Sequence, residues 1–355
     1  MSSRTSPTVY ILLLLAVTAS SVWHVLGKMA LTHGMDASVF LVYRLLISSA
    51  ILLLGGMFVL RLPFVMPIRE IQPRLILIGI ATFLHSVFFL YGLQLTNPFM
   101  CAVMQPAVPV LVWLFSVISG AERSNVRKAI GVALCSLGAA GAAASSSHHA
   151  EQTSADEGAN FKTGIVLIIL QCIFYAIHLV FQQPLLHAMP PVQVVGMLYA
   201  IAGLIMLGVA GLQTVFVKQF LPVFAPDKVG HMEAPYWGLS PDPTAWLALG
   251  FCVLFASVFT HGVYSWATKK VAATTVSVFI TIEPLTTTVV SLIITKSGLT
   301  SATEAACAKM LISSSPLPPS YTLGPPIVAN STSALSVPFA FQIPVFASCA
   351  AYTTL

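Results

Sequence analysis

One carboxylate stands alone in a long apolar stretch of the chain. Residues 272–295 carry apolar or hydroxylated side chains except for Glu283 near the centre. As a helix rising about 1.5 Å per residue, this stretch would cross a hydrocarbon core of about 30 Å, with Glu283 near the midplane. An ionised side chain there costs about 3 kcal/mol or more. We predict that Glu283 carries protons or binds a cationic group of a substrate; the alternative is a glutamate that only hydrogen-bonds a neighbouring helix.

The residue after this glutamate is a proline. Pro284 has no backbone N–H, and its ring clashes with the carbonyl of Ile280, so the helix is predicted to bend there. Thr286 and Thr287 follow Glu283 on the same helix face, where their hydroxyls could satisfy the freed backbone groups. Glu283 and Pro284 together are therefore predicted to mark an irregular point in the span.

Other side chains that could do chemistry are spread over several apolar stretches. His24, His85, His178 and His261 could carry protons, or each could be a buried imidazole satisfied by a neighbour. Gln105 could bind substrate or bridge two helices, and aromatic residues near helix ends are often interfacial anchors. The side chains predicted for a substrate or proton pathway are Glu283, Pro284, His85, His261, His178, Gln105, Tyr91, Trp266, Trp23 and Tyr175.

The composition indicates a protein built in a membrane. Of the 355 residues 57% are hydrophobic and only 8% are charged, and the mean hydropathy is +0.90. A soluble domain has about 25% charged residues, so we predict an all-α polytopic membrane protein in contact with lipid. The net charge is +5, but most of the basic residues lie in predicted loops between apolar stretches, so no nucleic-acid partner is predicted. The six cysteines show no CxxC spacing, and neither a metal nor another cofactor is expected.

Apolar stretches long enough to cross a bilayer recur along the chain. The first could be a signal peptide, but its apolar character continues to Leu31, which favours a retained helix. More basic residues lie on the N-terminal side of the predicted spans than on the opposite side. By the positive-inside rule, this predicts a cytoplasmic N-terminus. The identity of the membrane stays open. Nine spans are predicted, near 9–31, 37–60, 74–96, 98–119, 127–147, 163–183, 192–217, 244–268 and 271–295.

The spans divide into two halves that resemble each other. Tyr91–Pro109 aligns without a gap on Trp266–Pro284 when it is shifted by 175 residues. Each copy has an aromatic residue at the end of one helix, a tight connection and a helix interrupted by proline. Five spans precede the second half, and an odd number inverts the second copy, as in secondary transporters. The predicted units are a first repeat (1–147), a polar linker (148–162), a second repeat (163–295) and a Ser/Pro-rich tail expected to be disordered (296–355).

These residues resemble the EamA family of the drug/metabolite transporter superfamily. The resemblance rests on Trp23, Lys28, Tyr43-Arg44, Pro109, Gly120-Ala121-Glu122-Arg123 and Glu283-Pro284, over about residues 9–295. Residues 174–195 are also similar to the plant nodulin-like, Walls-Are-Thin-related branch. The resemblance implies a carrier of two inverted five-helix repeats, with the fifth and tenth helices peripheral. The tenth helix is expected to be missing here, because prolines interrupt the chain after Thr295.

Two further expectations concern single helices. Arg44, early in the second span, is expected to reach the interface by snorkelling. Gly131, Cys135, Ala139 and Ala143 form a small-residue stripe in the fifth span, which could serve close packing or a homodimer contact.

The sequence thus predicts a secondary transporter that moves a small organic metabolite by alternating access. The alternative is a truncated relative that binds a partner or small molecule without transporting it. An enzyme is not expected, because neither HExxH nor GxSxG occurs.

Overall fold

The computed structural model describes most of residues 7–290. The described residues are 7–64, 69, 71–122, 130, 155–215, 237, 242–284, 286–287 and 289–290, with side chains described from residue 161 onward in the second half. All regular structure in these ranges is helical. The linker 148–162 is therefore described only at its end, and the tail 296–355, with its expected disorder and missing helix, lies outside these ranges.

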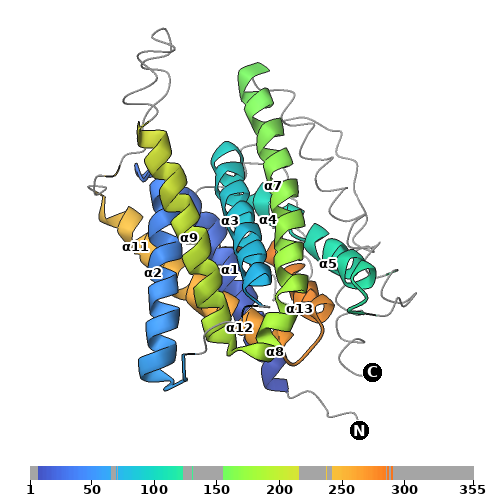
Figure 1. The fold of residues 1–355 in the computed structure, drawn as a ribbon. Coiled ribbons are helices and arrows are strands. Elements are labelled where there is room, and N and C mark those ends of the chain that lie inside the picture. The colour runs from blue at the N-terminus through green and yellow to red at the C-terminus, as the bar shows by residue number, and fades with distance from the viewer. Residues whose placement is uncertain are drawn as a thin grey trace, which may run out of the picture.

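The helices are coloured in their order along the chain in Figure 1. In the first half they are α1 (Pro7–Thr32), α2 (Ala37–Leu54), the π-helix η1 (Gly55–Val59), α3 (Gln72–Leu95), α4 (Pro98–Met104) and α5 (Ala107–Ile118). In the second half they are α7 (Ala155–Phe181), α8 (Gln183–Ala188), α9 (Pro191–Val215), α11 (Pro243–Phe251), the π-helix η4 (Cys252–Phe259), α12 (Thr260–Thr268) and α13 (Ala273–Ile280).

Polar side chains define where several helices begin. The Asp36 carboxylate accepts from the backbone N–H of Ser38 at 2.8 Å and so caps α2. Asn97 caps α4 and Asp242 caps α11 in the same way, each followed by a proline in the first turn. These side chains satisfy backbone donors that a helix start leaves without partners, and proline fits there because its missing N–H is not needed.

Seven helices in the described ranges are long and apolar enough to cross a membrane. They correspond to seven of the nine predicted spans, so the all-helical, multi-pass architecture is confirmed. The predicted fifth span, 127–147, lies outside the described residues apart from residue 130, and with it the small-residue stripe. The predicted ninth span, 271–295, is described only in its first part and is not one continuous α-helix.

Helices of the first half pack mainly against helices of the second half. The main contacts join α3 to α7 and α9, α2 to α9, α5 to α7 and α13, and α1 to the α11–η4–α12 segment. Figure 1 shows α2, α9, α3 and α7 side by side. Glycines allow close approach: a Cβ at Gly203 would lie 2.6 Å from Leu46 Cδ2, and one at Gly92 would lie 2.8 Å from Ile168 Cγ1.

A half-buried lysine joins α1 to the end of α3. The Lys28 ammonium donates to the backbone carbonyls of Leu93 at 2.9 Å, Gln94 at 2.7 Å and Thr96 at 2.8 Å. These carbonyls belong to the last turn of α3, where a helix leaves acceptors without partners. Lys28 uses its three donors on them, so its part in the fold is to cap α3.

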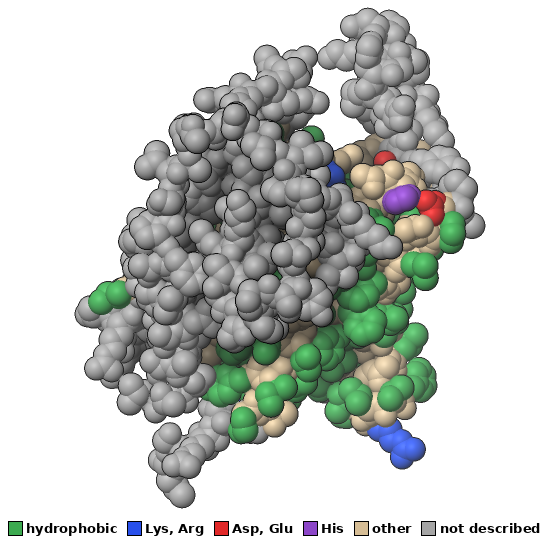
Figure 2. All heavy atoms as spheres, turned by 180° about the vertical axis from the view of Figure 1, so that it is seen from behind, with side chains coloured by type: hydrophobic (Ala, Val, Ile, Leu, Met, Phe, Trp, Pro, Cys, Tyr) green, Lys and Arg blue, Asp and Glu red, His purple; other side chains and the backbone are tan. Residues whose placement is uncertain are grey.

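The outward faces of the bundle are apolar. Leu14, Leu15, Leu204, Leu247 and Leu254 are all exposed on the spanning helices. Figure 2 shows mostly hydrophobic side chains where the described residues are visible, with the charged ones toward the top and bottom of the view. This pattern suits helices that face lipid.

Candidate functional site

The helix that carries the lone carboxylate is broken just before it. α13 ends at Ile280, Thr281 and Ile282 form a turn, and Glu283 and Pro284 are helical again. The predicted irregularity exists, but the break precedes Glu283 instead of beginning at Pro284. The physical reason is the missing N–H of Pro284, which could not have bonded the carbonyl of Ile280.

A second break occurs in the first half. α4 ends at Met104, Gln105 and Pro106 form a turn, and α5 begins at Ala107. Pro106 and Thr281 are 175 residues apart, which is the shift of the sequence repeat. Both breaks therefore fall at matching places, and each presents a polar side chain, Gln105 or Glu283, beside the interruption.

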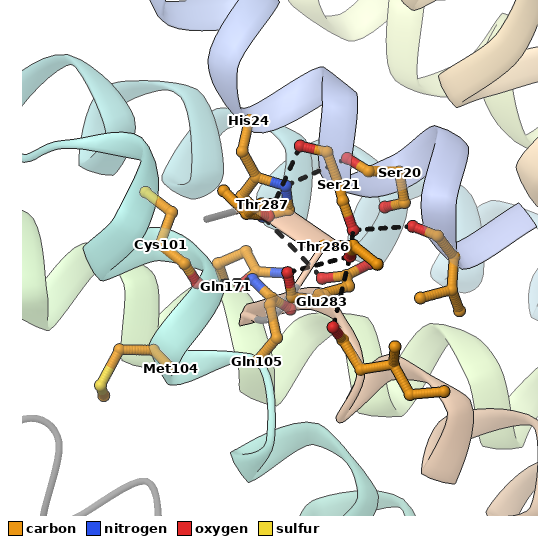
Figure 3. Close-up of polar contacts among 12 residues, drawn as sticks. Ser20, Ser21, His24, Cys101, Met104, Gln105, Gln171, Glu283, Thr286 and Thr287 are labelled. Atoms are coloured by element: carbon orange, nitrogen blue, oxygen red, sulfur yellow. Dashed lines mark hydrogen bonds and ion pairs between the residues drawn. The ribbon is translucent and has the colours of Figure 1, made fainter. Parts of the chain in front are cut away.

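Glu283 is buried against α1. Its side chain lies beside Ser20, and its Oε2 lies 3.9 Å from Nε2 of His24. Only 3% of Glu283 is exposed. Figure 3 shows Ser20, Ser21 and His24 on one side of the carboxylate and Gln105 and Gln171 on another. These contacts are compatible with both predicted roles of Glu283, a glutamate that only contacts a neighbouring helix and a proton site.

The tautomer of His24 determines what this pair can do. His24 Nδ1 lies 3.0 Å from the Ser20 carbonyl, which can only accept, so Nδ1 carries a hydrogen. Nε2 then faces the carboxyl with a lone pair when the ring is neutral, and no described residue hydrogen-bonds it. Two acceptors would repel each other, whereas one added proton on either group makes the contact attractive. The geometry therefore suits a pair that holds one proton.

Hydroxyl groups tie the broken segment to α1. The hydroxyls of Ser21 and Thr286 are hydrogen-bonded to each other, and Thr286 also contacts the carbonyl of Glu283 at 3.1 Å. Thr287 Oγ1 lies 3.5 Å from the Ser21 carbonyl. Thr286 thus contacts backbone groups as predicted, although they are those of Glu283 and Ile282 and not that of Ile280.

A small cavity opens beside Glu283. Its volume is about 50 Å³, which is room for a few water molecules. Six of the predicted pathway residues line it: Trp23, His85, Gln105, Tyr175, His261 and Glu283. Seven lining residues were not in that prediction: Ser20, His24, Arg44, Ser86, Phe89, Gln171 and Ala256.

Three histidines form a cluster, and two of them, His85 and His261, line this cavity. The ring centroid of His85 lies 5.6 Å from that of His178 and 6.3 Å from that of His261. Thr82 donates its hydroxyl to the Ile78 carbonyl and accepts from Nδ1 of His178, which fixes that ring in place. No three His, Cys, Asp or Glu side chains in the described ranges are placed to hold a metal ion.

The remaining predicted pathway residues do not line the cavity. His178 lies behind His85 in the histidine cluster, and Pro284 adjoins Glu283. Tyr91 bonds Ser38 of α2 through its hydroxyl at 2.7 Å. Trp266 lies under Lys270, whose ammonium is 3.9 Å from the ring centroid. For Tyr91 and Trp266 these contacts favour the packing or interfacial alternative.

Arg44 contradicts the expectation of snorkelling. It is only 7% exposed, lines the cavity, donates from Nε to Ser257 at 2.8 Å and lies over the Trp23 ring. The side chain points inward because α2 turns this position toward α1 and η4, where Trp23 and Ser257 receive it. Its ionisable character within an apolar stretch was the signal that could have identified it. Gln171 and Phe89 carried no comparable signal.

Comparisons with known proteins agree with this architecture. The sequence model of the EamA-like transporter family matches residues 7–143 and 162–314. Protein WALLS ARE THIN 1 of Arabidopsis thaliana is 28% identical over 200 residues, which cover 47% of this chain and 50% of that relative. The match therefore spans about half of the relative's length. A crystal structure with 16% identity superposes with a TM-score of 0.57 over 88% of this chain and 96% of the other, which shows a shared fold.

Proposed function

The chain belongs to the EamA-like transporter family, and we propose that it is a secondary transporter that moves a small organic metabolite by alternating access between its two halves. It is an integral membrane protein with several spanning helices. Membership in this family indicates transport of small solutes.

The observation that carries the proposal is the place of Glu283. It is a buried carboxyl at a helix break, and it lines a cavity formed by both halves of the chain. Trp23, Arg44 and His85 come from the first half, and Tyr175, His261 and Glu283 itself come from the second. A carboxyl between two such halves can meet a substrate or proton from either side as the halves move.

The His24–Glu283 contact supports proton coupling. A pair that holds one proton can release it to water when one side opens and take it up again from the other side. In this buried arrangement the pair keeps that proton, because without it two acceptors would face each other at 3.9 Å. We therefore assign Glu283 as the proton carrier and His24 as its partner.

The packing of the two halves supports alternating access. In an inverted repeat of five-helix units, a contact between two helices should recur between their counterparts. α3 packs on α7, and correspondingly α1 packs on α12; α5 packs on α7, and correspondingly α1 packs on α13. Such paired contacts allow two equivalent arrangements that open toward opposite sides. The proposed orientation has a cytoplasmic N-terminus.

Reconstitution tests this function. Purified protein in vesicles is supplied with a metabolite mixture, with and without a pH gradient, and the contents are measured by mass spectrometry. We expect at least one small organic metabolite to accumulate in proportion to the gradient. Metabolites bound by the protein but never taken up would favour a non-transporting binding protein. Uptake that ignores the pH gradient would reject Glu283 as a proton carrier.

A further inference from the structure

A buried cation in the cavity has no anionic partner among the described residues. Arg44 is more than nine-tenths buried on α2, and its described contacts are the Ser257 hydroxyl and the Trp23 ring. The two ion pairs of the described part of the chain are His24–Glu283 and His33–Asp242, and neither includes Arg44. A buried charge is costly unless it is paired, so an unpaired arginine in a cavity indicates a missing anion.

The other acids whose side chains the structure describes are engaged elsewhere. Asp36 caps α2, Asp242 caps α11, and Glu122 accepts from Thr274 at the start of α13. Glu283 lines the same cavity but lies beside Ser20 and His24. None of them lies within 4.0 Å of the guanidinium, since no such pair is found. The counter-charge of Arg44 must therefore come from outside the described residues.

The guanidinium is held in one orientation. It lies 4.1 Å from the centroid of the Trp23 ring, which also makes stacked contacts with Phe40 and with Phe89, each at a centroid distance of 5.6 Å. Ser257 takes the Nε donor. The two Nη groups form no hydrogen bond to any described residue. A fixed guanidinium with its terminal nitrogens unused is suited to bind a carboxylate through two parallel hydrogen bonds.

We propose that Arg44 is a specificity-determining residue that binds a carboxylate group of the transported solute. This deepens the proposed function, on which it rests for the use of the cavity, by restricting the solutes to carboxylates and excluding uncharged ones. A solute with a carboxylate alone would leave Glu283 to the proton. A zwitterion would in addition place its ammonium group in reach of Glu283. Ser257 and Trp23 are positioning residues, because they act only through Arg44.

The test is a binding comparison that does not depend on transport. Small carboxylic acids, aliphatic, aromatic and α-amino, are each paired with the corresponding primary amide. Their binding to the purified full chain in lipid nanodiscs is measured by thermal shift and calorimetry. We expect at least one acid to bind about tenfold or more tightly than its amide, from the loss of a charge-assisted bidentate contact. The α-amino acids and the simple acids distinguish a zwitterionic solute from a plain carboxylate.

Variants locate the effect. In Arg44→Gln the acid should bind only as tightly as its amide. In Arg44→Lys part of the preference for the acid should remain, because lysine keeps the positive charge but lacks the two parallel N–H donors of the guanidinium. Arg74→Gln, at an exposed arginine in the first turn of α3, should leave the difference unchanged. If Arg44→Gln does not fold, the comparison of acids with amides on the unaltered protein still decides.

The proposal is overturned if no acid binds the unaltered protein better than its amide, or if the preference persists in Arg44→Gln. Failure of the proposed function has a different signature. Acids bound through Arg44 without uptake into vesicles would reject transport and keep the carboxylate site. Uptake of solutes without any preference for the acid would support transport and reject the carboxylate site.

Discussion

His24 Nε2 faces Glu283 Oε2 at 3.9 Å, while Nδ1 of the same ring is committed to the Ser20 carbonyl. The distance is too long for a direct hydrogen bond, so a small approach of α1 to the broken helix would form one, and a small separation would admit water. A movement that changes this single distance would thus change the proton affinity of the pair. We therefore expect a movement of α1 to change how tightly His24 and Glu283 hold their proton.

Replacing Glu283 by glutamine should abolish proton-driven accumulation while the protein still reaches its membrane. The amide keeps the size and hydrogen-bonding capacity of the side chain but cannot bind and release a proton. Uptake into vesicles should lose its response to an imposed pH gradient, whereas exchange of solute across the membrane without a gradient can continue. Glu122→Gln is the control, because the amide oxygen of the new side chain can still accept from the Thr274 hydroxyl. Unchanged accumulation and pH dependence in Glu283→Gln would reject the assignment.

His85→Ala and His261→Ala should each impair transport more than His178→Ala does. His85 and His261 line the cavity, whereas His178 is held behind them by Thr82. His187→Ala, at an exposed histidine of α8, serves as the control and should leave transport unchanged. Initial uptake rates at matched protein amounts measure the effect. Equal, small losses at all three buried positions would mean that the cluster serves packing alone.

Much of this architecture could be predicted from apolar length alone. Seven predicted spans coincide with helices, because a segment that must satisfy its own backbone in lipid has few alternatives to a helix. Glu283 was found for the same reason, as a charge where charges are rare. Arg44 was misplaced because snorkelling and burial depend on which way α2 faces, and that is set by Trp23 and Ser257 from other helices. Ser20 and Gln171 are ordinary polar residues whose place at the site depends on tertiary packing.

Lys28→Met should lower the stability of the protein by about 1 to 3 kcal/mol, because the carbonyls at the end of α3 would lose a charged donor. Methionine matches the length of the lysine stem, so the apolar contacts of the side chain are largely kept. Lys162→Met, at an exposed position of α7, is the matched control. Thermal unfolding of the detergent-solubilised variants measures the difference. Equal midpoints for both variants would show that the cap contributes nothing.

Gly92→Val should destabilise the contact between α3 and α7 by about 1 to 3 kcal/mol through overpacking. A Cβ there would lie 2.8 Å from Ile168 Cγ1 and 3.3 Å from the Gly164 carbonyl. Gly208→Val introduces the same residue into α9, where no atom lies within 4 Å of the new Cβ. Both variants carry the helix cost of valine, so their difference in unfolding midpoint isolates the packing. No difference would mean that the helices adjust freely.

The orientation can be read from the sequon Asn330-Ser331-Thr332, which lies outside the described residues. Nine spans from a cytoplasmic N-terminus place this segment on the non-cytoplasmic side. Expression through a secretory pathway should then give a glycosidase-sensitive gel shift that Asn330→Gln removes. Protease protection of a C-terminal tag provides the second measurement. A tag cleaved only from the cytoplasmic side would contradict nine spans.

The π-helical segment η4 determines which way the side chains of the following helix, α12, face. Each π-type hydrogen bond spans one residue more than an α-type bond, so η4 shifts the helix faces that follow. One residue corresponds to about 100° of rotation around an α-helix. Deleting a single residue of η4, and so letting it relax to an α-helix, would swing His261 out of the cavity while the apolar length of the span stayed almost the same. The site is thus encoded partly in a count of residues and not only in their types.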